Sequence, residues 1–149
     1  MIRLKEENVL AKVRSKEIKK RQELYFFRES LALHDICSTK LNVCKLVVIG
    51  QQPDVISLNV LSKLVYLQEL WLIECKLKDI SSLKECTKLE KLYVYSNEIE
   101  QIPNLSRIPR LAILSLSGNN IDRLTVSRDI FHFCLPSIDI KSRFLSKRS

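Results

Sequence analysis

The chain has 149 residues, which suits one domain, and its 46% apolar and 28% charged residues are typical of a globular protein. The formal net charge of +8 lies in the flanks: residues 1–45 hold eleven Lys/Arg against six Asp/Glu, and residues 125–149 hold five against two. Residues 46–124 hold nine of each. Nucleic-acid binding needs a basic stripe on the folded surface, so this distribution argues against a nucleic-acid partner.

The sequence has no apolar secretory segment at its start and no run of about 18 uncharged apolar residues. We therefore expect no membrane insertion and a cytoplasmic protein. An odd number of cysteines without a secretory signal indicates reduced thiols, and the absence of a C-x-x-C pair argues against a zinc site. We expect no metal and no cofactor. The cysteines are Cys37, Cys44, Cys75, Cys86 and Cys134.

Residues 1–42 are predicted to form a helical segment that caps the first repeat of the chain. Within residues 2–36, apolar positions recur at helical spacing between charges, without Pro or Gly: Leu10, Val13, Leu24, Phe27, Leu31 and Ile36. Its basic part, residues 13–22, could bind calmodulin or a membrane surface, but a solvated helix face is the favoured interpretation.

Residues 43–124 contain about four copies of one pattern. Three copies with a 22-residue period begin at 67, 89 and 111, and a weaker, slightly longer copy precedes them. The predicted repeat core is Leu67, Leu70, Leu72, Leu89, Leu92, Val94, Leu111, Leu114 and Leu116. The turn position that follows each of the three strands is Cys75, Asn97 and Asn119, and Gln51 takes it in the weaker copy.

This spacing is the L-x-x-L-x-L-x-x-N/C-x-L signature of leucine-rich repeats. Alternate residues of a strand face opposite sides, so the two leucines of each L-x-L point inward together. One repeat cannot bury its apolar face, so neighbours must stack. An Asn at the strand end can donate and accept hydrogen bonds to the turn backbone, and Cys75 can replace it less completely.

Residues 67–124 resemble the 22-residue class of intracellular leucine-rich repeats, which includes protein-phosphatase regulatory solenoids and axonemal dynein light-chain repeats. The resemblance implies an α/β solenoid, a right-handed superhelix with a concave parallel sheet, which binds another protein and has no catalytic residues. A phosphatase or an axonemal or cytoskeletal component is the partner that the resemblance implies, and the cilium and the nucleus are alternatives to the cytoplasm.

The outward strand positions predict a binding surface on the concave sheet. Trp71 and Tyr93 are predicted to anchor a partner, with neighbours on the same strands around them. The predicted contact residues are Trp71, Tyr93, Tyr95, Ile73, Glu69, Glu74 and Lys91. The alternatives are that the aromatic side chains only pack on one another, or that the N-terminal segment covers them.

Residues 125–149 do not continue the 22-residue pattern, so we expect an irregular C-terminal cap and a basic, disordered tail over 141–149. His34 and His132 lie in opposite flanks, and no recognisable catalytic motif is present. The sequence therefore predicts a non-catalytic protein-interaction module. The alternative is a structural segment of a longer repeat array with no separate binding role.

Overall fold

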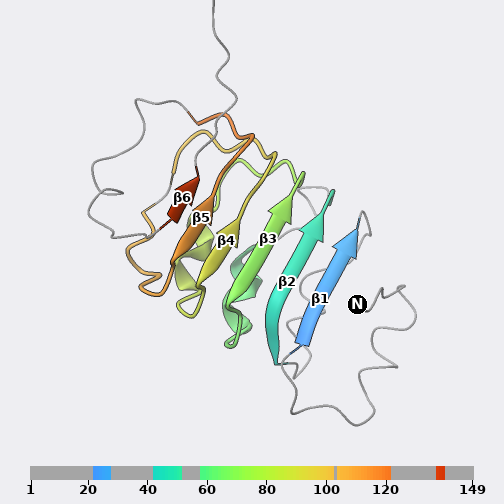
Figure 1. Cartoon of the computed structure of the whole chain (residues 1–149), viewed down its shortest axis with the longest axis vertical. Coiled ribbons are helices and arrows are strands. Elements are labelled where there is room, and N and C mark those ends of the chain that lie inside the picture. The colour runs from blue at the N-terminus through green and yellow to red at the C-terminus, as the bar shows by residue number, and fades with distance from the viewer. Residues whose placement is uncertain (1–21, 28–41, 52–57, 103, 122–136, 140–149) are drawn as a thin grey trace, which may run out of the picture.

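The computed structural model describes residues 22–27, 42–51, 58–102, 104–121 and 137–139. These residues build one parallel sheet of six strands in chain order (Figure 1). The strands are β1 (Gln22–Phe27), β2 (Val43–Ile49), β3 (Glu69–Ile73), β4 (Lys91–Tyr93), β5 (Ile113–Ser115) and β6 (Ser137–Asp139). Two short 3₁₀ helices, η2 (Leu58–Lys63) and η3 (Ser81–Glu85), precede β3 and β4.

Each strand pairs with the next at the same point of the repeat. Leu70 of β3 lies opposite Leu92 of β4, and Leu92 lies opposite Leu114 of β5. Both steps equal one repeat period, so the backbone advances by one complete coil for each repeat. This alignment of equivalent leucines is what the 22-residue period predicts for a solenoid.

The core lies between the sheet and the returning segments that carry the 3₁₀ helices. The inward side chains of the strands pack with Leu58 and Leu61 of η2 and Leu83 of η3, all buried. We call the opposite side of the sheet the open face. All nine predicted core residues are buried: Leu67, Leu70, Leu72, Leu89, Leu92, Val94, Leu111, Leu114 and Leu116. Each such side chain contributes roughly 1.5–3 kcal/mol before conformational entropy is counted.

A left-handed backbone residue ends each of four strand segments. Gly50, Glu74, Ser96 and Gly118 hold equivalent places just before the turn column, and their φ angles are 69°, 53°, 51° and 76°. The left-handed region favours glycine, which explains why both glycines of the chain fall in this column. Glu74 and Ser96 adopt the same conformation with a side chain, at a cost to stability.

The predicted N-terminal helix is wrong at residues 22–27, which form strand β1 instead. Leu24 and Phe26 are buried while Tyr25 and Phe27 are half-exposed, which is the alternation of a strand. The spacing from Leu24 to Phe27 fits a helix locally, but pairing with β2 decides the conformation, because Leu24 lies opposite Leu46. The other residues of the predicted helical segment, apart from Asn42, lie outside the described residues.

The predicted irregular C-terminal cap is wrong at residues 137–139, which form β6 and pair parallel with β5. Ile138 lies opposite Leu114, and the chain between them is slightly longer than one repeat period. This longer connection breaks the strict 22-residue period, although the apolar position recurs. The predicted disordered tail over 141–149 lies outside the described residues.

Candidate functional site

A row of alternating charges crosses the open face at the start of the strands. The strand register places Glu23, Lys45, Glu69 and Lys91 side by side on β1 to β4. The Lys45 Nζ lies 2.9 Å from Glu69 Oε1, and the Lys91 Nζ lies 3.5 Å from Glu69 Oε2. These ion pairs join neighbouring strands. The formal charges of the row sum to zero, so the row gives the open face no net charge.

Glu69 is the centre of this row. Burial raises the pKa of its carboxyl, but the hydrogen bonds from Lys45 and Trp71 and the positive charges of Lys45 and Lys91 together outweigh burial, so the pKa lies below the ordinary value. The bond from Trp71 Nε1 to Glu69 Oε1 measures 2.7 Å. The hydrogen bond to Glu69 in turn raises the pKa of Lys45. Both groups are therefore charged at neutral pH, and the carboxylate orients the indole ring.

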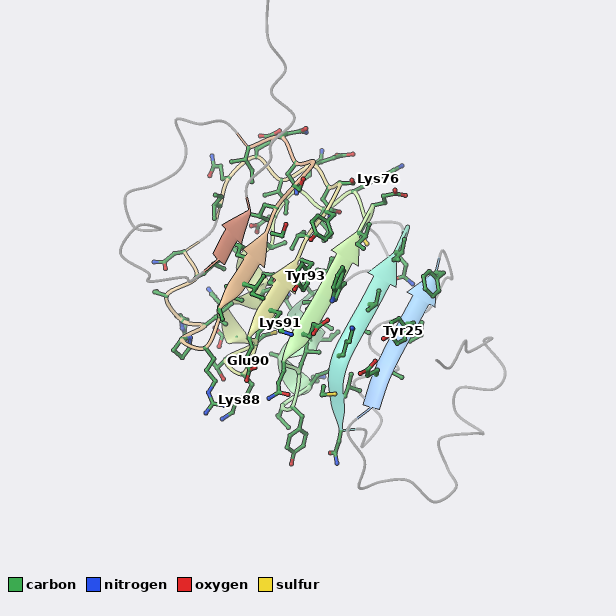
Figure 2. All side chains as sticks on the ribbon, in the orientation of Figure 1. Tyr25, Lys76, Lys88, Glu90, Lys91 and Tyr93 are labelled. Carbon is green, nitrogen blue, oxygen red and sulfur yellow. The ribbon has the colours of Figure 1, made fainter. Side chains whose placement is uncertain are left out.

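Three aromatic rings gather beside the charge row. Trp71 stacks on Tyr93 with ring centroids 4.0 Å apart and an interplanar angle of 27°. Tyr95 lies 6.0 Å from Trp71 and 5.9 Å from Tyr93. We call Trp71, Tyr93 and Tyr95 the aromatic cluster. Figure 2 shows Lys91 and Tyr93 on the same part of the sheet. The rings are half-exposed, so they pack on one another and still present a surface.

Sequence reasoning missed the part of this surface that β1 supplies. The register puts Tyr25 in the same row as Val47, Trp71 and Tyr93. Lys45 Nζ lies 5.9 Å from the Tyr25 ring centroid and 5.7 Å from that of Trp71, so one ammonium bridges two aromatic rings. Tyr25 lies 22 residues before Val47, which is one repeat period, and this spacing could have identified Tyr25 from the sequence.

An apolar row follows near the end of the strands. Phe27 lies opposite Ile49, and Ile49 lies opposite Ile73, all half-exposed. Tyr95 holds the equivalent place one repeat after Ile73. On the following repeat, serines at 115 and 117 replace the large side chains. The apolar part of the open face is therefore concentrated on β1 to β4.

Not every predicted contact residue joins this surface. Glu74 comes after β3, is exposed, and has a left-handed backbone at the strand end. Its backbone N–H donates to the Tyr95 carbonyl at 3.1 Å, which continues the sheet ladder. Glu69, Trp71, Ile73, Lys91, Tyr93 and Tyr95 lie on the open face, whereas Glu74 lies on its rim.

The predicted turn residues hold backbone groups together behind this surface. The Asn97 amide accepts from the N–H groups of Cys75 and Leu77 and donates to the carbonyls of Leu72 and Tyr95. Asn119 accepts from Ile99 and donates to the carbonyls of Val94 and Leu116. Burial raises the pKa of the Cys75 thiol, so this cysteine is protonated at neutral pH and is a poor nucleophile.

Within the described ranges, no three His, Cys, Asp or Glu side chains lie together in a way that could hold a metal ion. None of the helices there is long and apolar enough to cross a bilayer. His34 and His132 lie outside the described residues.

Residues 67–107 match the family model described as Leucine Rich repeats (2 copies). The chain is similar to leucine-rich repeat-containing protein 56 of Mus musculus, with 36% identity over 63 residues, and of Rattus norvegicus, with 38% identity over 58 residues. These matches cover 42% and 39% of this chain, and 11% of each relative. The matched segment is thus about a ninth of the length of these relatives.

Two solved structures of internalins align with this chain. An internalin C2 from Listeria monocytogenes aligns with a TM-score of 0.42 and 24% identity, over 60% of this chain and 38% of the internalin. A second internalin (inlF) from the same bacterium aligns with a TM-score of 0.40 and 22% identity, over 72% of this chain and 36% of its own.

Proposed function

We propose that this chain is a non-catalytic protein-interaction module that holds a partner protein on the open face of its sheet. Trp71 and Tyr93 are the anchors of the proposed interface, and Ile73 and Tyr95 extend it. Glu69, Lys91 and the rim residue Glu74 set the orientation of the partner. The single observation that carries the proposal is the half-exposed aromatic cluster, because rigid aromatic side chains in a patch are typical of interface anchors.

The charge row supports the same proposal. Lys45, Glu69 and Lys91 already satisfy one another, so removing them from water costs less than burying an unpaired charge. The hydrogen bond from Trp71 to Glu69 holds the indole ring in place before a partner arrives. An anchor that is already ordered loses little side-chain entropy on binding.

The nature of the partner is also a proposal. Residues 70–105 resemble the early repeats of leucine-rich repeat-containing protein 9, within the 22-residue intracellular class. This likeness suggests a phosphatase or an axonemal or cytoskeletal component as partner, and a place in the cytoplasm, cilium or nucleus. The similarity to leucine-rich repeat-containing protein 56 supports the repeat class and does not extend to a partner.

A second candidate role is a structural segment of a longer repeat array, with no separate binding function. The observation that favours it is the short match to the relatives, which covers 11% of the length of the mouse protein. In that case, the open face would be one stretch of a longer surface, and its aromatic cluster would serve packing alone.

Affinity capture followed by mass spectrometry distinguishes the two roles. The bait is the full chain, compared with Trp71→Ala, with Ile73→Lys, which adds a charge to the open face, and with the exposed control Lys78→Ala. We expect both open-face variants to lose a partner that the wild type and the control retain. Thermal unfolding shows whether each variant is folded. Equal capture by all four folded proteins would support the structural-segment role instead.

A further inference from the structure

Basic and acidic residues are nearly equal in number over residues 58–121, but they are distributed unequally between the two edges of the sheet. Residues 58–121 carry eight Lys/Arg and seven Asp/Glu. At the edge where strands begin, five are basic (Lys63, Lys84, Lys88, Arg107 and Arg110) and two are acidic, for a net charge of +3. At the edge where strands end, two are basic and four are acidic, for a net charge of −2. The remaining two, Glu69 and Lys91 on the strands, cancel.

Figure 2 shows Lys88 and Glu90 at the start of the strands and Lys76 at the opposite edge. The near-neutral middle of the sequence therefore conceals a basic edge. Residues one repeat apart stack on one another, so the like charges of Lys88 and Arg110, which are 22 residues apart, lie side by side on this edge.

Three equivalent turns form the tip of the basic edge. Leu67, Leu89 and Leu111 each donate a backbone hydrogen bond to the residue three positions earlier, at 2.9 to 3.1 Å. Tyr66, Lys88 and Arg110 occupy the same place in these turns, and all three are exposed. We call them the turn-tip row. The strands that follow are paired, so neighbouring turns lie about 5 Å apart.

The acidic groups of this edge are already engaged. Glu85 pairs with Arg107 at 3.3 Å, and Glu90 accepts a hydrogen bond from Gln68 at 3.2 Å. In the part of the chain that the structure describes, Lys88 and Arg110 make no ion pair. Lys88 and Arg110 thus stand side by side without an ion pair, next to an aromatic ring that is 57% exposed.

We propose that the turn-tip row binds a carboxylate-rich segment of a partner protein. Lys88 and Arg110 attract the carboxylates, and the Tyr66 ring, with the exposed Val65 beside it, contacts an apolar residue of the same segment. The pair between Arg107 and Glu85 is a precedent on this edge for a guanidinium that holds a carboxylate. This surface is separate from the open face, so its partner contact does not depend on Trp71.

The test uses a fluorescein-labelled peptide of alternating glutamate and leucine, titrated with the full chain and followed by fluorescence anisotropy. The double variant Lys88→Glu/Arg110→Glu reverses the row's charge. The double variant Lys76→Glu/Lys78→Glu makes the same change of net charge at the opposite edge and is the matched control. All four positions are exposed, so thermal unfolding should match that of the wild type.

We expect the first double variant to bind the peptide about tenfold more weakly or worse, and the control to bind nearly as well as the wild type. Tyr66→Ser should weaken binding severalfold, Trp71→Ala should leave it unchanged, and added salt should weaken it throughout. An equal loss in both double variants would mean that net charge alone drives binding, and would overturn the proposal. So would loss of binding in Trp71→Ala, or tighter binding of a single-stranded oligonucleotide with the same dependence on Lys88 and Arg110.

Discussion

The Asn97 side chain completes the backbone hydrogen bonds of Cys75 in the repeat before it. Its Oδ1 accepts from the Cys75 N–H at 2.9 Å and from the Leu77 N–H at 3.2 Å, and its Nδ2 donates to the Leu72 and Tyr95 carbonyls. The Cys75 thiol faces the corresponding pair of carbonyls, Ile73 at 3.2 Å and Val48 at 3.7 Å. Cysteine therefore supplies the donor half of the asparagine's role and lacks the acceptor half.

Asn97→Ala should lower the free energy of unfolding by about 3 kcal/mol, because it leaves several buried backbone groups without partners. Cys75→Ala should cost less, about 1 kcal/mol, because only weak sulfur contacts are lost. Urea denaturation of the two variants measures the difference. A loss for Asn97→Ala no greater than that for Cys75→Ala would show that the asparagine column does not hold the coils together.

Gly118→Ala should destabilise the chain by about 1–2 kcal/mol. The φ angle of Gly118 is +76°, and an added Cβ would lie 3.2 Å from Ser96 Oγ and 3.3 Å from the Ser96 backbone. Ser96→Gly at the equivalent place should be neutral or stabilising, since it relieves a left-handed residue that carries a side chain. Thermal unfolding of both variants checks this opposite pair of signs, and a stabilised Gly118→Ala variant would contradict it.

The ion pairs of Glu69 predict how stability depends on pH. The folded pKa of Glu69 lies below its ordinary value of 4.5, so its contribution is fully present above that value. The contribution is lost as the pH falls through the folded pKa. The raised pKa of Lys45 has the opposite sense: its contribution is present below about pH 10.5 and is lost as the pH rises through the folded value.

The measurement is the unfolding free energy of the wild type and of Glu69→Gln across the acid range. We expect the wild type to be the more stable at neutral pH, and the gap to close as the pH falls below 4.5 and through the folded pKa of Glu69. Because both partners lie partly in solvent, the gap at neutral pH should be modest, about 1 kcal/mol. A gap that stays constant between neutral and acid pH would contradict the part assigned to the charge of Glu69.

The central repeats could be predicted because their period is strict. Leu70, Leu92 and Leu114 recur once in every repeat, and a strand of alternating burial follows directly from that spacing. The open-face positions of Trp71 and Tyr93 also followed from it. Their stacking distance and the hydrogen bond from Trp71 to Glu69 did not, because side-chain rotamers depend on neighbours that the pattern does not specify.

The ends of the sheet could not be predicted in the same way, for two physical reasons. Ile138 follows Leu114 by more than one period, because the loop between β5 and β6 is slightly longer. A pattern of strict 22-residue spacing therefore does not include Ile138. In β1, the apolar residues at 24, 26 and 27 satisfy a helical and a strand pattern at once. Only the hydrogen bonds offered by the β2 edge decide between them, and these are long-range contacts.

The neighbouring phenylalanines of β1 provide a matched test of that strand. Phe26 is 1% exposed in the core, and Phe27 is half-exposed on the open face. If residues 22–27 form a strand, Phe26→Ala should cost about 3–5 kcal/mol of unfolding free energy, and Phe27→Ala well under half of that. A helix docked through Leu24, Phe27 and Leu31 would reverse the order, because Phe27 would then be the buried ring. Urea denaturation of the two variants in the full chain therefore distinguishes the two conformations. A larger loss of unfolding free energy for Phe27→Ala would contradict the strand conformation of residues 22–27.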